Sequence, residues 1–162
     1  MDGKSQQDMQ GAKQSVFRLL KFRPRSVGEI REKLAAKNFD ASTIEQTVDY
    51  FKKQQLLDDR LFARGWAASR LKKPWGIARI RRELRDKGVD AESINAAFAA
   101  QFGEYDEAQT VLDLAKRRAE KYRDNDVLTA KRRLYDYLCR RGFSAAAVSK
   151  TLRTIYRHDD NG

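Results

Sequence analysis

The sequence predicts an all-α protein built from three tandem three-helix repeats. Three observations support this prediction: a recurring spacing of apolar residues, a helix stop followed by a helix cap in every repeat, and a low content of helix breakers. The chain of 162 residues has only two prolines and nine glycines. No segment alternates apolar and polar residues between turn signals, so we expect no β-sheet.

Five apolar positions recur three times with the same internal spacing. The steps between them are four, five, five and four residues, and the three sets lie 50 and 54 residues apart. Self-similarity of this kind is typical of a repeat protein. The sets are Ile30, Leu34, Phe39, Ile44 and Val48; Ile80, Leu84, Val89, Ile94 and Phe98; and Leu134, Leu138, Phe143, Val148 and Leu152.

A helix corner is predicted in the middle of each set. Each corner has a residue that tolerates the left-handed conformation that ends many helices. These residues are Asn38, Gly88 and Gly142. Two residues later comes a side chain that can cap a new helix. The capping residues are Asp40, Asp90 and Ser144. The apolar residue between stop and cap can pack on both helices, so one side chain fixes the angle of each corner.

A further helix is predicted before each of these helix pairs. In the first repeat, Ser26 and Glu29 form a capping box for the helix that follows it. In the second repeat, two adjacent aspartates at positions 58 and 59 favour the start of the helix that precedes the helix pair. The predicted preceding helices span about residues 13–22, 59–72 and 105–122.

Each repeat is too small to hold a large core of its own, because about fifty residues is near the lower limit for an independent fold. Stacking of neighbouring repeats would bury more apolar area. We therefore expect an elongated, curved, stacked array, with a compact bundle as the structural alternative. The predicted organisation is a disordered tail over 1–12, repeats over 13–57, 58–102 and 103–157, and a C-terminal tail over 158–162.

The chain is strongly basic, and the basic surplus is uneven. The formal net charge is +11, and the isoelectric point is about 9.9. The net charge is +3 over residues 1–58, but +5 over 70–90 and +6 over 116–141. Such a surplus attracts polyanions, mainly through phosphate contacts and counterion release. We therefore expect the second and third repeats to bind an anionic partner.

Candidate binding residues follow this surplus. Arginine and lysine bind the phosphates of a nucleic acid, and they can equally face acidic patches on a protein. The non-functional alternative is a solvated helix face that nearby carboxylates partly neutralise. Trp75 could stack on a base, anchor an interface or pack between repeats. The candidates are Lys72, Lys73, Trp75, Arg79, Arg81, Arg82, Arg85, Lys116, Arg117, Lys131, Arg132, Arg133, Arg140 and Arg141.

The sequence offers no reaction centre. His158 is the only histidine and Cys139 the only cysteine, so neither a disulfide within the chain nor a catalytic Cys–His pair is expected. No metal-ligand spacing, phosphate-binding glycine loop or dinucleotide fingerprint occurs. We expect no catalytic residue, no metal and no cofactor. The polar start and the lack of a long apolar run predict a cytoplasmic protein that does not associate with membranes.

The second repeat carries a specific block of residues. It reads Leu56-Leu57-Asp58-Asp59-Arg60-Leu61-Phe62-Ala63, with Arg70, Gly76, Ile80, Glu83, Leu84 and Lys87-Gly88-Val89 beyond it. This block resembles the central signature of the RecX family of bacterial recombinase regulators. The run from Arg25 to Phe39 is similar to the family's first repeat, and the third repeat matches in its apolar frame alone. Asn38 departs from the usual Lys-Gly-Phe arrangement, but it can serve the same left-handed stop.

The resemblance implies a modulator of RecA. Members of the family are tandem three-helix arrays that bind the groove of the filament of RecA on single-stranded DNA. They inhibit its ATP hydrolysis, strand exchange and stimulation of repressor self-cleavage, in recombination, DNA repair and the SOS response. The RecA filament is therefore the expected partner of a monomeric chain. Direct contact with single-stranded or duplex DNA stays open.

Two other functions fit the same residues. A stand-alone DNA-binding module could use the second repeat as a helix-turn-helix, because Gly88 allows the sharp corner. Tight binding to duplex DNA without RecA would favour this alternative. A structural adaptor that binds only protein is the other possibility. It would retain RecA binding and fail to bind any nucleic acid.

Overall fold

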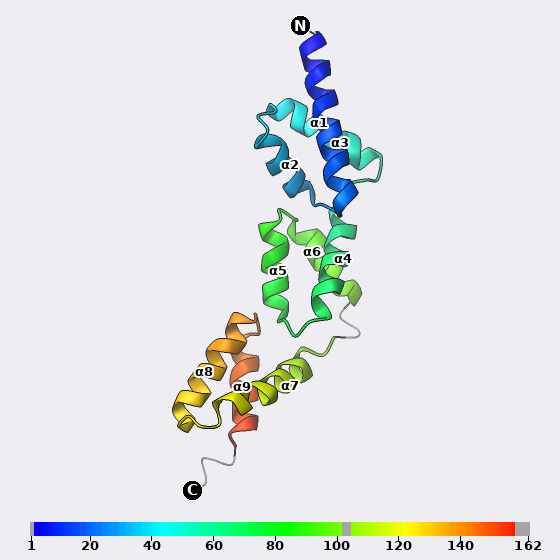
Figure 1. The fold of residues 1–162 in the computed structure, drawn as a ribbon. Helices are drawn as coiled ribbons and strands as arrows, with labels where there is room; N and C mark the ends of the chain where they lie inside the picture. The colour runs from blue at the N-terminus through cyan, green and yellow to red at the C-terminus, as the bar shows by residue number, and fades with distance from the viewer. Residues whose placement is uncertain (1, 102–104, 158–162) are drawn as a thin grey trace. The chain divides into compact units, whose positions relative to one another are not determined.

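The computed structural model describes residues 2–101 and 105–157, and every regular element in these ranges is helical (Figure 1). The all-α prediction is therefore confirmed. None of the helices described is both long enough and apolar enough to cross a membrane. The elements are α1 (Asp2–Phe22), α2 (Val27–Ala35), α3 (Ala41–Lys53), α4 (Asp59–Leu71), α5 (Ile77–Asp86), α6 (Ala91–Gln101), α7 (Glu107–Ala119), the short 3-10 helix η1 (Glu120–Tyr122), α8 (Val127–Arg140) and α9 (Ala145–Ile155).

The chain divides into two compact units. Unit 1 comprises Met1–Trp66 with Leu84–Ala99, and unit 2 comprises Ala67–Glu83 with Ala100–Gly162. The boundary runs through the second predicted repeat, so α4 and α5 each contribute residues to both units. The apolar spacing alone does not reveal this division.

Unit 1 has a core between its first three helices. Helix α1 packs on α2 and α3, and α2 packs on α3. Phe51 is completely buried, and its ring lies 4.8 Å from the ring of Phe17 in an edge-to-face contact. The buried residues of this core are Ala12, Val16, Val27, Ile30, Leu34, Ile44, Val48, Phe51 and Leu57.

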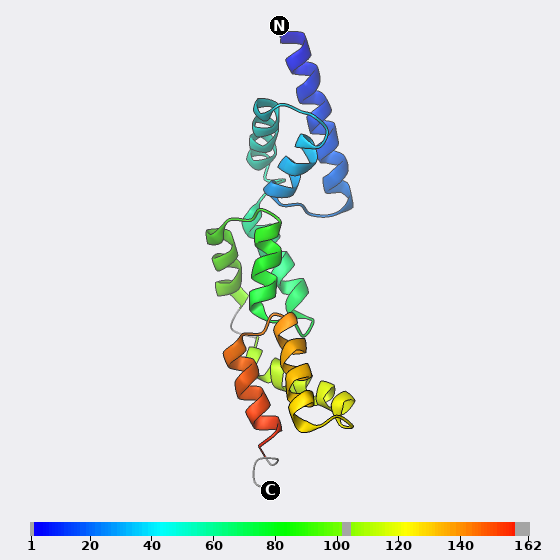
Figure 2. The same cartoon turned by 90° about the vertical axis from the view of Figure 1, so that its left-hand side faces the viewer.

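Helix α1 is longer than the sequence predicts. It begins at Asp2, whereas a disordered tail was expected over residues 1–12. Ala12 is completely buried, and the Thr47 hydroxyl donates a hydrogen bond of 3.3 Å to the sulfur of Met9. Met9, Ala12 and Val16 follow helical steps of three and four residues, so the core stripe extends into the expected tail. The N-terminal part of α1 runs past α2 and α3 (Figure 2). The predicted C-terminal tail, 158–162, lies outside the described residues.

Unit 2 has its own core. Helix α7 packs on α8 and α9, and α8 packs on α9. Leu134 and Leu138, two of the predicted anchors, are completely buried. The buried residues of this core are Val111, Leu114, Ala115, Leu134, Leu138, Phe143 and Val148.

The three predicted corners share one backbone geometry. The left-handed residues Asn38, Gly88 and Gly142 have φ angles of 62°, 75° and 88°. In every corner, the amide of the next residue donates to the carbonyl five residues earlier, which satisfies a group at the helix end. These bonds are Phe39 to Leu34 at 3.3 Å, Val89 to Leu84 at 3.1 Å and Phe143 to Leu138 at 3.4 Å.

The predicted caps are also present. Each capping side chain accepts a hydrogen bond from the amide three residues later, as helix caps do. The bonds are Thr43 to Asp40 at 3.0 Å, Ser93 to Asp90 at 2.8 Å and Ala147 to Ser144 at 3.2 Å. The capping box of Ser26 and Glu29 at the start of α2 is complete. The repeated corner chemistry is therefore confirmed.

Candidate functional site

Within unit 1, the start of α2 contacts the corner between α5 and α6. We call the contact of Ser26–Glu29 with Lys87–Gly88 the unit 1 joint. The Ser26 hydroxyl donates a hydrogen bond of 2.5 Å to the backbone carbonyl of Lys87. A Cβ atom on Gly28 would come within 2.5 Å of the same carbonyl oxygen. A residue with a side chain therefore cannot replace Gly28 without moving the two backbones apart.

Glu29 is the charged centre of the unit 1 joint. Its carboxylate lies 2.6 Å from the Arg23 guanidinium, 3.1 Å from the Lys87 ammonium and 3.9 Å from Arg25. Burial disfavours the charged form of Glu29, but hydrogen bonds from Arg23, Lys87 and the Ser26 amide outweigh burial and lower its pKa to about 2. The cations of this joint therefore have a carboxylate partner inside the protein.

Within unit 2, the start of α5 contacts the corner between α8 and α9. We call the contact of Trp75–Arg79 with Arg140–Phe143 the unit 2 joint. The Gly76 amide donates a hydrogen bond of 2.9 Å to the carbonyl of Arg141. A Cβ atom on Gly76 would overlap the carbonyl group of Gly142. The unit 2 joint thus repeats the close backbone approach of the unit 1 joint.

Both joints also share a bond from a helix start to a carboxylate. The first amide of α2, that of Val27, donates to Asp59 at 2.8 Å. The first amide of α5, that of Ile77, donates to Glu107 at 2.9 Å. Asp59 and Glu107 are the first residues of α4 and α7, so each connects its helix to the helix start of the preceding repeat.

The structure separates the roles of the adjacent aspartates Asp58 and Asp59. The sequence assigns both to the start of a helix. The amides of Arg60 and Leu61 donate to Asp58 at 2.8 and 3.1 Å, so Asp58 has that role. Asp59 instead accepts a bond from the unit 1 joint, and burial raises its pKa. Asp59 is thus a structural residue of the joint as well as the first residue of α4.

Trp75 lies close to two arginines at the unit 2 joint. The guanidinium carbon of Arg79 lies 3.2 Å from the centre of the Trp75 ring, and that of Arg141 lies 5.3 Å from it. Arg79 also donates a hydrogen bond of 3.4 Å to the carbonyl of Arg140. The Tyr105 hydroxyl donates to the Trp75 carbonyl at 2.7 Å. This arrangement favours the packing alternative for Trp75 over stacking on a base.

The structure thus brings candidates from two predicted repeats together at the unit 2 joint. These candidates are Trp75, Arg79, Arg140 and Arg141. The only carboxylate paired with Arg79 among the described residues is that of Glu83, at 3.2 Å. Arg85 belongs to unit 1 and is not part of this cluster.

Many of the other candidates have exposed side chains with no hydrogen bond, ion pair or ring contact to any described residue. Such side chains are available to an external anion. They are Lys72, Lys73, Arg82, Arg85, Lys116, Arg117 and Arg132. Three candidates differ: Arg81 is half-buried, Arg133 donates to the Asn125 side chain at 3.0 Å, and the Lys131 ammonium lies 5.5 Å from the Tyr156 ring centre.

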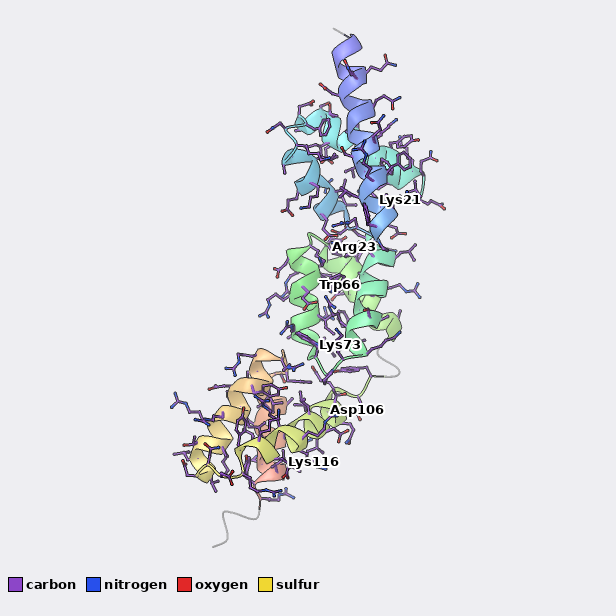
Figure 3. The ribbon with its side chains drawn as sticks, in the orientation of Figure 1. Lys21, Arg23, Trp66, Lys73, Asp106 and Lys116 are labelled. Carbon is purple, nitrogen blue, oxygen red and sulfur yellow. The ribbon has the colours of Figure 1, made fainter. Side chains whose placement is uncertain are left out.

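Lys72 and Lys73 lie beside an open hollow of about 420 Å³ in unit 2. The turn after α4 forms one side of the hollow, and the start of α7 forms the other. Figure 3 labels Lys73 and Asp106, which both line it. The hollow is lined by Leu71, Lys72, Lys73, Pro74, Tyr105, Asp106, Gln109, Thr110 and Asp113.

Sequence reasoning missed the carboxylate of Glu107 and the role of Tyr105. A signal for Glu107 was present, because an acidic residue begins the first helix of the second and of the third repeat. Asp59 follows Val27 by 32 residues, and Glu107 follows Ile77 by 30. Nothing comparable marks Tyr105, whose hydroxyl contacts a backbone carbonyl 30 residues earlier in the sequence.

Known family models match all three parts of the chain. Residues 12–51 match the model described as "RecX, first three-helix domain", 58–97 the second three-helix domain and 104–152 the third. The chain is 33% identical to "Regulatory protein RecX" of Chlorobium phaeobacteroides (strain BS1), over 88% of this chain and 91% of that protein. Identity to "Regulatory protein RecX" of Serratia proteamaculans (strain 568) is also 33%, over 88% of this chain and 94% of that one.

Solved structures show the same fold. One, described as "Crystal structure of regulatory protein RecX", has a TM-score of 0.79 at 22% identity and covers 89% of this chain and 72% of its own. Another, of RecX from Lactobacillus salivarius, has a TM-score of 0.77 at 17% identity, with 91% of this chain and 96% of that chain covered. Together with the three family models and the similar sequences, the tandem repeat of helix corners shows that the chain belongs to the RecX family of regulatory proteins.

Proposed function

We propose that this protein binds the filament of RecA on single-stranded DNA and inhibits its ATP hydrolysis, strand exchange and stimulation of repressor self-cleavage. It would thereby regulate recombination, DNA repair and the SOS response, acting as a monomer in the cytoplasm without chemistry of its own. Membership of the RecX family supports this proposal. The residues that we assign to binding are the basic candidates of unit 2.

The observation that carries the assignment is the excess of unpaired cations in unit 2. Lys72, Lys73 and Arg82 are exposed, and among the described residues they have no carboxylate partner. The same holds for Lys116 and Arg117 on α7. Exposed charges without internal partners steer association with an oppositely charged surface. Both acidic surfaces of a protein filament and DNA phosphates provide such a surface.

The first test is RecA ATPase activity on single-stranded DNA with increasing amounts of this protein. We expect inhibition that saturates with protein and weakens at higher salt, because exposed charges are screened. Absence of inhibition at excess protein, in both low and moderate salt, would contradict the proposal. Tight binding to duplex DNA without RecA would instead favour a stand-alone DNA-binding module.

A second test uses two adjacent lysine pairs. Reversal of Lys72 and Lys73 to glutamate should weaken inhibition about tenfold or more, since two attractive charges become repulsive. The matched control reverses Lys52 and Lys53, which are also exposed but lie at the end of α3 in unit 1. Equal loss of inhibition in both double variants would show that net charge, and not the unit 2 surface, governs binding.

A further inference from the structure

The outward face of α1 carries two exposed aromatic rings. Phe22 is 83% exposed and Phe17 is 50% exposed. The opposite face of the helix holds Val16, Leu19 and Leu20 against the unit 1 core. Figure 3 labels Lys21 and Arg23 at the C-terminal end of this helix. The exposed rings are therefore not needed to complete the core, apart from the contact of Phe17 with Phe51.

The chain segment that contains this face has basic residues and no acidic ones. Five basic residues and no acidic residue occur between Met9 and Gly28. Some of these cations are occupied, because Arg23 and Arg25 pair with Glu29 in the unit 1 joint. Two are not. The side chains of Arg18 and Lys21 are exposed and have no partner among the described residues.

Helical geometry interleaves the rings with the free cations. Phe17 and Lys21 are one turn apart, and so are Arg18 and Phe22. The two rings therefore do not form one continuous apolar patch, because cations stand between them. A protein interface usually has a core depleted in charged residues, but on this face charged residues stand between the rings. Single-strand binding combines a cationic track for the backbone with aromatic rings for the bases, and this face has that combination.

We propose that Phe17, Arg18, Lys21 and Phe22 form a binding site for single-stranded nucleic acid on unit 1. The rings stack on unpaired bases, and the two cations bind phosphates of the same strand. Duplex DNA does not fit this mode, since its bases are already stacked and paired. The site is distinct from the basic residues of unit 2 and does not depend on the proposed action on RecA.

The test measures binding of the full chain to a fluorescent deoxythymidine oligonucleotide by anisotropy. Phe22→Ala should weaken binding about fivefold or more, the lower end of what one stacked base contributes. Phe22→Trp should retain or strengthen it, because the larger ring stacks at least as well. The control is Leu128→Ala, which truncates a 79% exposed apolar side chain in unit 2. Thermal unfolding should be unchanged in these variants, since none of the removed atoms is buried.

A second pair of variants tests the cations. Lys21→Glu should weaken binding and lower the dependence of affinity on salt by about one counterion. Lys33→Glu is the matched control, because Lys33 is an exposed lysine of α2 without a partner among the described residues. Binding to a duplex of the same length should not respond to Phe22→Ala.

Several results would overturn this inference. One is the absence of oligonucleotide binding by the unchanged chain. Another is an equal effect of Phe22→Ala and Leu128→Ala on affinity. Loss of RecA binding in Phe22→Ala, with oligonucleotide binding intact, would assign the face to a protein partner instead. Because the oligonucleotide assay contains no RecA, a failure of this site in that assay leaves the proposed inhibition of RecA to be judged by the ATPase test.

Discussion

The two joints have the same backbone design and different charge. In both, a helix start meets a left-handed glycine corner, Gly88 in unit 1 and Gly142 in unit 2. The third residue after Ser26 is Glu29 in unit 1, and the third residue after Gly76 is Arg79 in unit 2. Glu29 collects three cations, whereas Arg79 joins other arginines around Trp75. The acidic or basic residue at this position is thus one of the differences between a joint centred on a carboxylate and a joint rich in arginine.

This difference supports the proposed binding surface of unit 2, because the architecture of the joint is kept while its charge changes. The shared part of each joint consists of a hydrogen bond to the carbonyl that precedes the left-handed glycine, a close glycine contact and a carboxylate at the start of the next helix. The variable part consists of side chains that can change without disturbing that frame. Basic side chains of the unit 2 joint are then held in place by packing, as a preorganised binding surface requires.

The largest expected effect comes from filling the space at the close glycine contact of each joint. Gly76→Ala should lower the free energy of unfolding by about 3 kcal/mol, because its Cβ would overlap the Gly142 backbone. Gly28→Ala should act in the same direction at the unit 1 joint. Gly65→Ala is the control: its Cβ would meet no atom within 4 Å, so the helix should gain up to about 1 kcal/mol. Urea denaturation measures the stability of all three variants. An unchanged free energy of unfolding in Gly76→Ala would contradict the close backbone contact at the unit 2 joint.

The next effect depends on pH and concerns Glu29 of the unit 1 joint. The folded pKa of Glu29, about 2, lies below its ordinary value of 4.5. Its contribution to stability is therefore fully present above pH 4.5 and is lost as the pH falls toward 2. Glu29→Gln should lower the free energy of unfolding by about 2 kcal/mol at pH 7. It should also weaken the loss of stability at acid pH. Arg79→Gln should leave the loss of stability at acid pH unchanged. If it weakened that loss as much as Glu29→Gln does, the proposed difference between the joints would be contradicted.

A smaller effect should be common to both joints. Asp59→Ala leaves the Val27 amide without its acceptor, and Glu107→Ala does the same to Ile77. Each should cost about 1 kcal/mol, the order of one lost hydrogen bond to a partly buried group. Thermal unfolding of the two variants compares the joints directly. A loss confined to one of them would show that the two carboxylates are not equivalent.

The corners were predictable from sequence because they are local. The left-handed residue, the apolar residue and the cap lie within three positions, so each set of residues specifies its own geometry. Helix α1 was underestimated because the polar composition around Met9 concealed a stripe that only a contact with Thr47 makes visible. The joint partners were not predictable, since Gly76 and Gly142 are 66 positions apart and their contact depends on packing.

The smallest effect should come from exposed ion pairs outside the joints. Arg60 and Glu92 form such a pair, and both side chains are more than half exposed. Because solvent screens exposed charges, Arg60→Gln should change the free energy of unfolding by no more than about 0.5 kcal/mol. Chemical denaturation at low salt gives this value. A loss as large as that of Glu29→Gln would mean that ion pairing, and not the buried joint, explains the acid sensitivity.

The most direct test of the difference between the joints compares Lys87 and Arg141, which occupy the same corner position before Gly88 and Gly142. The measurement is the curve of RecA ATPase inhibition for Lys87→Gln and Arg141→Gln, taken below the melting temperature of both. We predict that Arg141→Gln weakens inhibition several-fold with little change in melting temperature. Lys87→Gln should lower the melting temperature and leave inhibition intact. Equal loss of inhibition in both variants, or a loss in Lys87→Gln alone, would contradict the proposed difference between the joints.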